Sequence, residues 1–384
     1  MATFLSRQEA DAGTWLGRVW RADVAGPAVV TLRKGRVLDI TSKAAPTVRD
    51  VCEMDDPLGF VRTEPGEDLG SFDELCAASV GDLSQNHLLA PCDLQAVKAC
   101  GVTFAGSMVE RVIEERAAGD LKAADAIRTK LAGTIGDSLR DIVPGSDQAA
   151  QVKEALKAEG LWSQYLEVGI GPDAEVFSKA QVLSAVGAGA QVGLHPVSTW
   201  NNPEPEIVLT VASKGNVIGA TLGNDVNLRD VEGRSALLLS KAKDNNSSAA
   251  IGPMIRLFDE GYSIDDVRAA ELSLRVEGED GFVLEGASSM KAISRDPLDL
   301  VQQTIGAHHQ YPDGFMLYLG TLFAPVKDRD VPGEGFTHKM GDRVSIQSEG
   351  LGVLSNEVRL STECMPWTFG VSALMRNLAQ RGLL

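Results

Sequence analysis

Short runs of apolar, often β-branched residues alternate with glycine-containing turns in the chain after about residue 175. Runs of this kind between turn residues are typical of strands. Two of the turns, at residues 214–216 and 278–281, have the composition of hairpin connections. The pattern therefore predicts a mixed, mainly antiparallel β domain. We predict its strands at 207–212, 217–221, 272–276, 344–347 and 357–360.

Segments with helical composition lie at the margins of this β domain. Helices are predicted at 264–270, 297–307 and 370–381. Two earlier segments, 121–131 and 147–159, are rich in alanine, lysine and glutamate, which favour helix over strand. We interpret these two segments as a helical insert or lid.

The first 95 residues have the pattern of a small β-rich unit. Apolar runs at 19–24 and 28–32 predict strands, and Gly26-Pro27 between them predicts a turn. Residues 55–70 have the composition of a loop, and a further strand is expected at 101–104. The fold class is therefore α+β. We divide the chain into an N-terminal β-rich domain (1–95), a strand with a helical insert (96–170) and a catalytic domain (171–384).

Composition and charge argue against several classes of protein. Of the 384 residues, 44% are hydrophobic and 23% charged, which is typical of a soluble protein. The formal net charge is −17 and basic residues form no stripe, so we expect no nucleic-acid partner. No apolar run approaches the roughly 20 residues of a membrane span, and the N-terminus does not resemble a secretory signal. We therefore predict a cytoplasmic protein without membrane contact. The five cysteines are scattered, which argues against a disulfide framework or a zinc knuckle.

Three carboxylates are the most informative residues. Glu204 and Glu206 lie two apart at the start of a predicted strand, so their side chains leave on the same face. The hairpin at 214–216 folds the next strand back, and Asp225 at its end returns to the two glutamates. Three converging carboxylates repel one another unless they share a cation. A set of oxygen ligands is typical of Mg²⁺ or Mn²⁺ rather than zinc.

A longer pattern surrounds these carboxylates. After Glu-x-Glu comes Gly-x-x-x-Gly-Asn-Asp-Val-x-x-Arg-Asp, which ends at Asp230. Lys243 is followed nine residues later by Gly252-Pro253, and Gly320-Thr321 stands further on. Residues 175–179 read Glu-Val-Phe-Ser-Lys. In this order, over about residues 97–360, the pattern resembles the fumarylacetoacetate hydrolase superfamily.

The resemblance implies the mixed β-roll catalytic fold of that family and assigns roles to several residues. Glu204, Glu206 and Asp225 would be ligands of Mg²⁺ or Mn²⁺, and a small 2-oxo sugar acid would be the partner. The family also implies a homodimer or homotetramer. We expect four residues to bind substrate: Lys179, Arg111, Asn224 and Thr321.

One departure from the family pattern bears on the reaction. Hydrolases of this family that cleave carbon–carbon bonds typically carry a histidine and a glutamate that activate water. Here Glu110 is kept, but Ser107 occupies the place of the histidine. A serine cannot act as a general base near neutral pH without a proton-accepting partner. Residues 101–107, 323–330 and 335–339 instead resemble the 2-dehydro-3-deoxy-pentonate dehydratase branch.

That branch implies conversion of a 2-dehydro-3-deoxy-pentonate, derived from xylonate or arabinonate, to 2,5-dioxopentanoate. Lys243 is our candidate for the base that takes the C3 proton, because a nearby metal and burial both lower the pKa of a lysine. Ser107, Glu110, Arg111 and Glu114 fall on one face of a predicted helix. From that face Glu110 or Glu114 would protonate the departing hydroxyl.

Two alternatives remain at this point. One is a hydrolase of the same superfamily that cleaves a 2,4-diketo acid of the acylpyruvate type. The other is a sugar-acid sensor without catalysis, which would require the loss of a metal ligand, whereas all three carboxylates are present.

Overall fold

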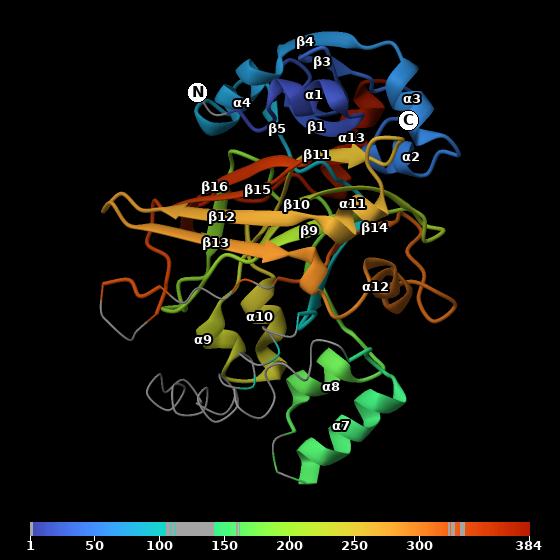
Figure 1. Cartoon of the computed structure of the whole chain (residues 1–384). Coiled ribbons are helices and arrows are strands. Elements are labelled where there is room, and N and C mark those ends of the chain that lie inside the picture. The colour runs from blue at the N-terminus through green and yellow to red at the C-terminus, as the bar shows by residue number, and fades with distance from the viewer. Residues whose placement is uncertain are drawn as a thin grey trace.

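The computed structural model describes residues 3–104, 108, 112, 142–158, 160, 162–321, 323, 327–330 and 335–384. Two β-sheets form the body of this part of the chain, and helices lie at its margins (Figure 1). The expected mixture of sheets with marginal helices is therefore confirmed.

The larger sheet has eleven strands among the described residues. Their order is β4-β3-β2-β1-β11-β10-β9-β14-β6-β7, and β5 pairs with β1. β14 runs parallel to β6, and the other pairs are antiparallel. The strands are β1 Trp15–Arg21, β2 Gly26–Arg33, β3 Arg36–Asp39, β4 Glu67–Ser71, β5 His87–Leu88, β6 Ala96–Gly101, β7 Glu175–Ala180, β9 Pro205–Val211, β10 Val217–Asp225, β11 Ala249–Leu257 and β14 Phe315–Tyr318.

The smaller sheet packs against the larger one, in the order β13-β12-β15-β16-β8. Its strands are β8 Gln191–Leu194, β12 Glu271–Glu277, β13 Val283–Ser289, β15 Arg343–Ser348 and β16 Gly352–Leu360. Buried and exposed residues alternate along β12, as expected for a sheet with one covered face. Leu272 and Leu274 of β12 share a core cluster with Ile207 and Leu209 of β9, so the main core lies between the two sheets.

Helices cover both ends of this body. In the view of Figure 1, α1 to α4 lie at the top, beside β1, β3 and β4 of the larger sheet, and α7 to α10 lie at the bottom. Their bounds are α1 Arg7–Ala12, α2 Val48–Cys52, α3 Pro57–Thr63, α4 Phe72–Val80, α7 Asp147–Ala158, α8 Gln164–Ile170, α9 Arg229–Glu232, α10 Leu239–Lys243, α11 Ile264–Ala269, α12 Pro297–Thr304 and α13 Val371–Gln380. Among the described residues, no helix has the length and apolarity that crossing a bilayer requires.

Strand β9 is buried on both faces, which explains its composition. Ile207 and Leu209 face the core between the sheets, whereas Val208 packs in a second cluster with Val48 and Val51 of α2. Every residue of β9 is buried. A strand covered on both sides reads as a continuous apolar run.

The predictions for the catalytic part agree with the structure within a few residues, but those for the N-terminal part are less accurate. The turn lies at residues 22–25 rather than at Gly26-Pro27, because both of these residues belong to β2. The predicted loop at 55–70 contains α3 and most of β4. Asp56 caps α3 by accepting a hydrogen bond from Gly59, and a proline at the first helical position favours the helix. The helix predicted at 121–131 lies outside the described residues.

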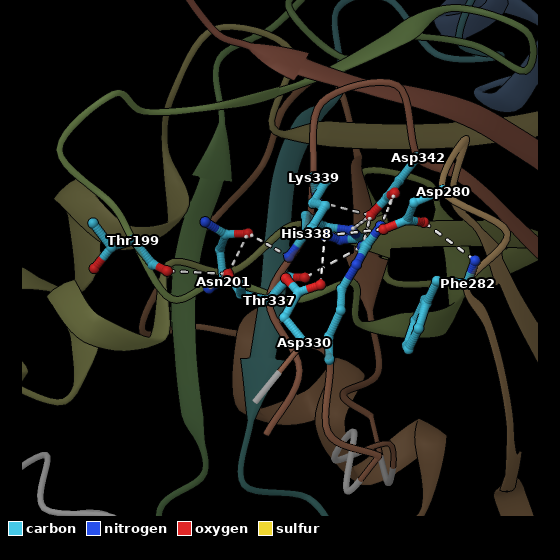
Figure 2. A network of polar contacts seen from close by, with 10 residues as sticks. Thr199, Asn201, Asp280, Phe282, Asp330, Thr337, His338, Lys339 and Asp342 are labelled. Atoms are coloured by element: carbon cyan, nitrogen blue, oxygen red, sulfur yellow. Dashed lines mark hydrogen bonds and ion pairs between the residues drawn. The ribbon is translucent and has the colours of Figure 1, made fainter. Parts of the chain in front are cut away.

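A buried ion pair ties the smaller sheet to the segment that leads into β9. Arg329 donates to both carboxylate oxygens of Asp342, at 2.5 and 2.9 Å, and both side chains are 1% exposed. His338 Nδ1 lies 3.3 Å from Asp342, and its backbone N–H donates to Asn201 Oδ1 at 3.2 Å. Figure 2 shows how this network joins the β12–β13 turn at Asp280 to Asn201. The network therefore holds Asn201, which lies three residues before Glu204 in the chain.

We predict that Asp342→Asn lowers the free energy of unfolding by about 3–5 kcal/mol, because the guanidinium of Arg329 would lose its main buried charge partner. Urea unfolding followed by circular dichroism measures the change. Glu285→Gln is the matched control, because Arg275 and Glu285 are 45% and 71% exposed and such a pair contributes at most about 1 kcal/mol. Equal midpoints for the two variants would contradict the prediction.

Candidate metal and substrate site

The β9–β10 hairpin brings the predicted carboxylates together. Glu206 lies opposite Gly223, so the start of β9 meets the end of β10. The backbone N–H of Asp225 donates to the carbonyl of Glu204 at 3.0 Å. One carboxylate oxygen from each of Glu204, Glu206 and Asp225 lies within 4.8 Å of the others, and all three residues are at most 5% exposed. The convergence expected from the sequence is therefore present in the structure.

Lys243 lies across two of these carboxylates. Its Nζ donates to Glu204 Oε2 at 2.5 Å and to Asp225 Oδ2 at 2.9 Å. Asn227 Nδ2 donates to the other oxygen of Glu204 at 3.1 Å. Lys243 is the last residue of α10, which places its ammonium group beside the end of β10. Both oxygens of Glu204 are thus held by donors from the segments that follow β10.

Lys179 of β7 approaches Asp225 from the buried side. Its Nζ lies 2.8 Å from Asp225 Oδ1 and donates to the carbonyls of Val226 at 3.1 Å and Lys243 at 2.6 Å. Burial lowers the pKa of Lys179, against the raising effect of Asp225. Burial would raise the pKa of Asp225, but the charges of Lys179 and Lys243 outweigh it and the pKa is lowered. Both lysines therefore stabilise the charge of Asp225.

Glu206 has a different electrostatic environment. Its Oε2 accepts the backbone N–H of Gly320 at 2.7 Å. Burial, together with the charges of Asp225 and Glu204, raises the pKa of Glu206 well above its ordinary value. A further positive charge would therefore stabilise the charged form of this carboxylate.

The donor set fits a hard divalent cation. The three converging ligands are carboxylate oxygens, which Mg²⁺ and Mn²⁺ prefer. Burial and the charges of Asp225 and Glu204 raise the pKa of Glu206, so a nearby cation would stabilise its charged form. Glu204, Glu206 and Asp225 are therefore the residues of the described chain that would hold such an ion.

A pocket opens beside the carboxylates, and its walls come from distant parts of the sequence. Gly101 ends β6 and Val102 follows it, Phe177 belongs to β7, and Thr321 follows β14. Val102 has a φ of +56°, an unfavourable backbone conformation for a β-branched residue. Strain of this kind is often found at functional sites.

Two further carboxylates line this pocket that the sequence analysis did not assign to it, Glu175 and Glu232. Glu175 is the first residue of β7, and Glu175, Phe177 and Lys179 alternate along that strand. The period of two would therefore have placed Glu175 on the same face as the predicted Lys179. Glu232 lies on α9, a helix of four residues, whose pattern is too short to give a sequence signal.

The described residues that were predicted to bind substrate lie in two different places. Thr321 lines the pocket, and its Oγ1 accepts the backbone N–H of Phe323 at 2.9 Å. Lys179 and Asn224 are fully buried behind the carboxylates. The Oδ1 of Asn224 accepts the backbone N–H of Glu204 at 3.1 Å. Their positions are those of residues that orient Asp225 and Glu204, because neither lines the pocket. Ser107, Glu110, Arg111 and Glu114 lie outside the described residues.

Comparison with known proteins was made by sequence and by fold. The family model described as fumarylacetoacetate (FAA) hydrolase C-terminal matches residues 171–359. A protein of Haloferax volcanii named probable 2-keto-3-deoxyxylonate dehydratase is 30% identical over 210 residues, which are 54% of this chain and 68% of that protein. The 2-dehydro-3-deoxy-D-arabinonate dehydratase of Saccharolobus solfataricus is 29% identical over 185 residues, which are 48% of this chain and 58% of that protein.

Solved structures with the same fold include 2-keto-3-deoxy-D-arabinonate dehydratase in its apo form, with a TM-score of 0.63 and 21% identity. The same enzyme complexed with magnesium and 2,5-dioxopentanoate has a TM-score of 0.61 and 20% identity. Each match covers 90% of this chain and 99% of that structure. The chain has the fold expected from the sequence, and it belongs to the fumarylacetoacetate hydrolase family.

Proposed function

We propose that this chain is a magnesium-dependent dehydratase that converts a 2-dehydro-3-deoxy-pentonate to 2,5-dioxopentanoate. The observation that carries the proposal is the buried triad of Glu204, Glu206 and Asp225 with the ammonium group of Lys243 beside it. The names of the two curated relatives support the same reaction. So does the ligand named for the structural neighbour, 2,5-dioxopentanoate with magnesium.

The triad would hold Mg²⁺ or Mn²⁺. When bound, the cation supplies Lewis-acid polarisation of the 2-oxo and carboxylate groups, which makes the C3 protons more acidic. The protein contributes the rest of the site. Lys179 and Asn224 orient Asp225 and Glu204 from behind, and the backbone of Gly320 holds Glu206.

Lys243 would take the C3 proton as the neutral amine, the form that a cation bound at the triad favours. The Nζ of Lys243 contacts both Glu204 and Asp225, and Lys243 lines the pocket. The amine therefore lies where the chelated end of a 2-oxo acid would be. Loss of the C3 proton and of the C4 hydroxyl gives water and a C3–C4 double bond. Movement of a proton from C5 to C3 then gives the C4–C5 enol, and transfer of its hydroxyl proton to C4 yields the C5 aldehyde.

A second group protonates the C4 hydroxyl as it leaves. Glu110 and Glu114 stay as predictions, because they lie outside the described residues. Glu175 is a further candidate, because its carboxylate lines the pocket with Lys243 and Thr321. Ser107, at the position of the family histidine, and Arg111 are proposed to contact the substrate.

The assembly, the location and the division into domains are also proposals. We propose a homodimer or homotetramer, a cytoplasmic location, and the division at residues 95 and 170. Exposed apolar side chains on the C-terminal segment support an assembly, namely Met365, Trp367, Val371 and Met375.

The metal site predicts a specific loss of binding. Asp225→Asn should weaken Mg²⁺ binding to the chelator-treated protein by more than about 100-fold, because outer-shell changes alone often cost 10–100-fold. Isothermal titration calorimetry measures the affinity. Asp230→Asn is the control, because it makes the same change in charge at a residue whose carboxylate binds Ser198 and Thr199 instead. Equal affinities for Mg²⁺ in the two variants would refute the assignment.

The reaction predicts one product. With Mg²⁺, each molecule of 2-dehydro-3-deoxy-pentonate should give one 2,5-dioxopentanoate, and a chelator should abolish turnover. Proton NMR identifies the product. The alternative, a 2,4-diketo acid hydrolase, releases two fragments. Faster cleavage of an acylpyruvate than dehydration of any 3-deoxy sugar acid would show that the hydrolase interpretation is correct.

The role of Lys243 predicts a separation of turnover from metal binding. Lys243→Ala should lower kcat by about 10²–10⁴-fold, the usual contribution of an acid–base group. Mg²⁺ affinity should not fall, because the variant removes a positive charge from the triad. Lys241→Ala, at an exposed position on the same helix, is the control. A near-native kcat in Lys243→Ala would show that another residue is the base.

A further inference from the structure

Glu232 is a buried carboxylate beside the metal triad but outside it. It is 7% exposed, ends helix α9, and lines the pocket together with Lys243 and Thr321. The described carboxylates that converge within 4.8 Å are Glu204, Glu206 and Asp225, and Glu232 is not among them. The proposed metal and base therefore leave Glu232 without an assigned part in the reaction.

The side chain of Asn227 holds Glu232 in place. Its Nδ2 donates to Glu232 Oε2 at 2.7 Å and to Glu204 Oε1 at 3.1 Å. Asn227 is fully buried, and its backbone exchanges two hydrogen bonds of 3.1 Å with Asn202. The buried amide of Asn227 thus links the position of Glu232 to that of Glu204. A side chain held in this way is preorganised for a ligand in the pocket.

The chemistry of the proposed substrate leaves one group for Glu232. The carboxylate and the 2-oxo group belong at the cation, the C3 proton goes to Lys243, and the C4 hydroxyl leaves as water. The terminal C5 hydroxyl stays on the carbon chain through the dehydration. A carboxylate is a strong acceptor for a hydroxyl that remains, and hydrogen bonds to charged groups are the stronger class.

We propose that Glu232 accepts a hydrogen bond from the terminal hydroxyl of the sugar acid and determines specificity for hydroxylated 2-oxo acids. The inference rests on the proposed function and adds a specificity residue to it. It gives Glu232 a role different from that of Glu175, which lines the same pocket and is a candidate proton donor.

The test compares two substrates, a 2-dehydro-3-deoxy-pentonate and 4-hydroxy-2-oxopentanoate, which has a methyl group in place of the terminal CH₂OH. Both lose water from C3 and C4, and the enone formed from the second is followed by its ultraviolet absorption. The measured quantity is the kcat/KM for the pentonate divided by the kcat/KM for 4-hydroxy-2-oxopentanoate, both with Mg²⁺. Intrinsic differences in reactivity affect this ratio equally in every variant, so they cancel when variants are compared.

Glu232→Ala should lower the ratio by about 10–100-fold, through loss on the hydroxylated substrate, as expected for one hydrogen bond to a charged acceptor. Glu232→Gln keeps an acceptor without charge and should lower the ratio by about fivefold. This second variant preserves the test if Glu232→Ala does not fold. The kcat/KM values are measured at Mg²⁺ concentrations that saturate each variant, as determined by calorimetry, because Asn227 links Glu232 to the metal ligand Glu204.

Three outcomes would overturn the inference. An equal loss of kcat/KM on both substrates would show that Glu232 is structural, and unchanged kcat/KM values on both substrates in both variants would show that it does not contact the hydroxyl. In either case the wild-type enzyme still dehydrates the pentonate, and the proposed function stands. A wild-type protein that dehydrates neither compound would overturn the proposed function, and this inference with it.

Discussion

The burial of three carboxylates within 4.8 Å of one another is the constraint on which the rest of the site depends. Buried charges are strongly unfavourable unless they are paired and hydrogen-bonded, so the surrounding chain supplies partners from several directions. Lys179 comes from β7, Lys243 from α10, and a backbone N–H from Gly320. These partners are distant in sequence, and they meet because β9 and β10 occupy the middle of the larger sheet.

The triad was predictable from the sequence because its geometry is local. Glu204 and Glu206 obey the period of two along a strand, and a short turn brings Asp225 back to them. Gly215 has a φ of +85°, which a glycine adopts without strain, so the turn itself could be read from the sequence. Such features depend on neighbouring residues and not on the packing of the whole chain.

The remaining parts of the site depend on long-range packing, which the sequence pattern does not contain. Lys179 was predicted to bind substrate. Its strand β7 is the edge strand next to β6 and places this lysine on the buried side of Asp225. Glu232 lies on a helix of one turn that has no periodic signal. The pairing of β1 with β11, which adds the N-terminal strands to the larger sheet, was not predicted either. Pairing between strands so distant in the chain is decided by tertiary contacts.

The two lysines are chemically alike but their environments separate their roles. Lys179 is fully buried, and its ammonium group is surrounded by Asp225 and the carbonyls of Val226 and Lys243. If Lys179 lost a proton, its buried amine would no longer supply the positive charge and all of the donors that Asp225 and the two carbonyls accept. Lys243 lines the pocket, and its contacts are carboxylates that would also serve a cation. A cation bound there would compete with Lys243 for these oxygens, and the lysine would then face the C3 proton of a chelated 2-oxo acid. The same charge cluster that requires compensation for folding thus gives one of its two lysines an environment that changes when metal and substrate bind.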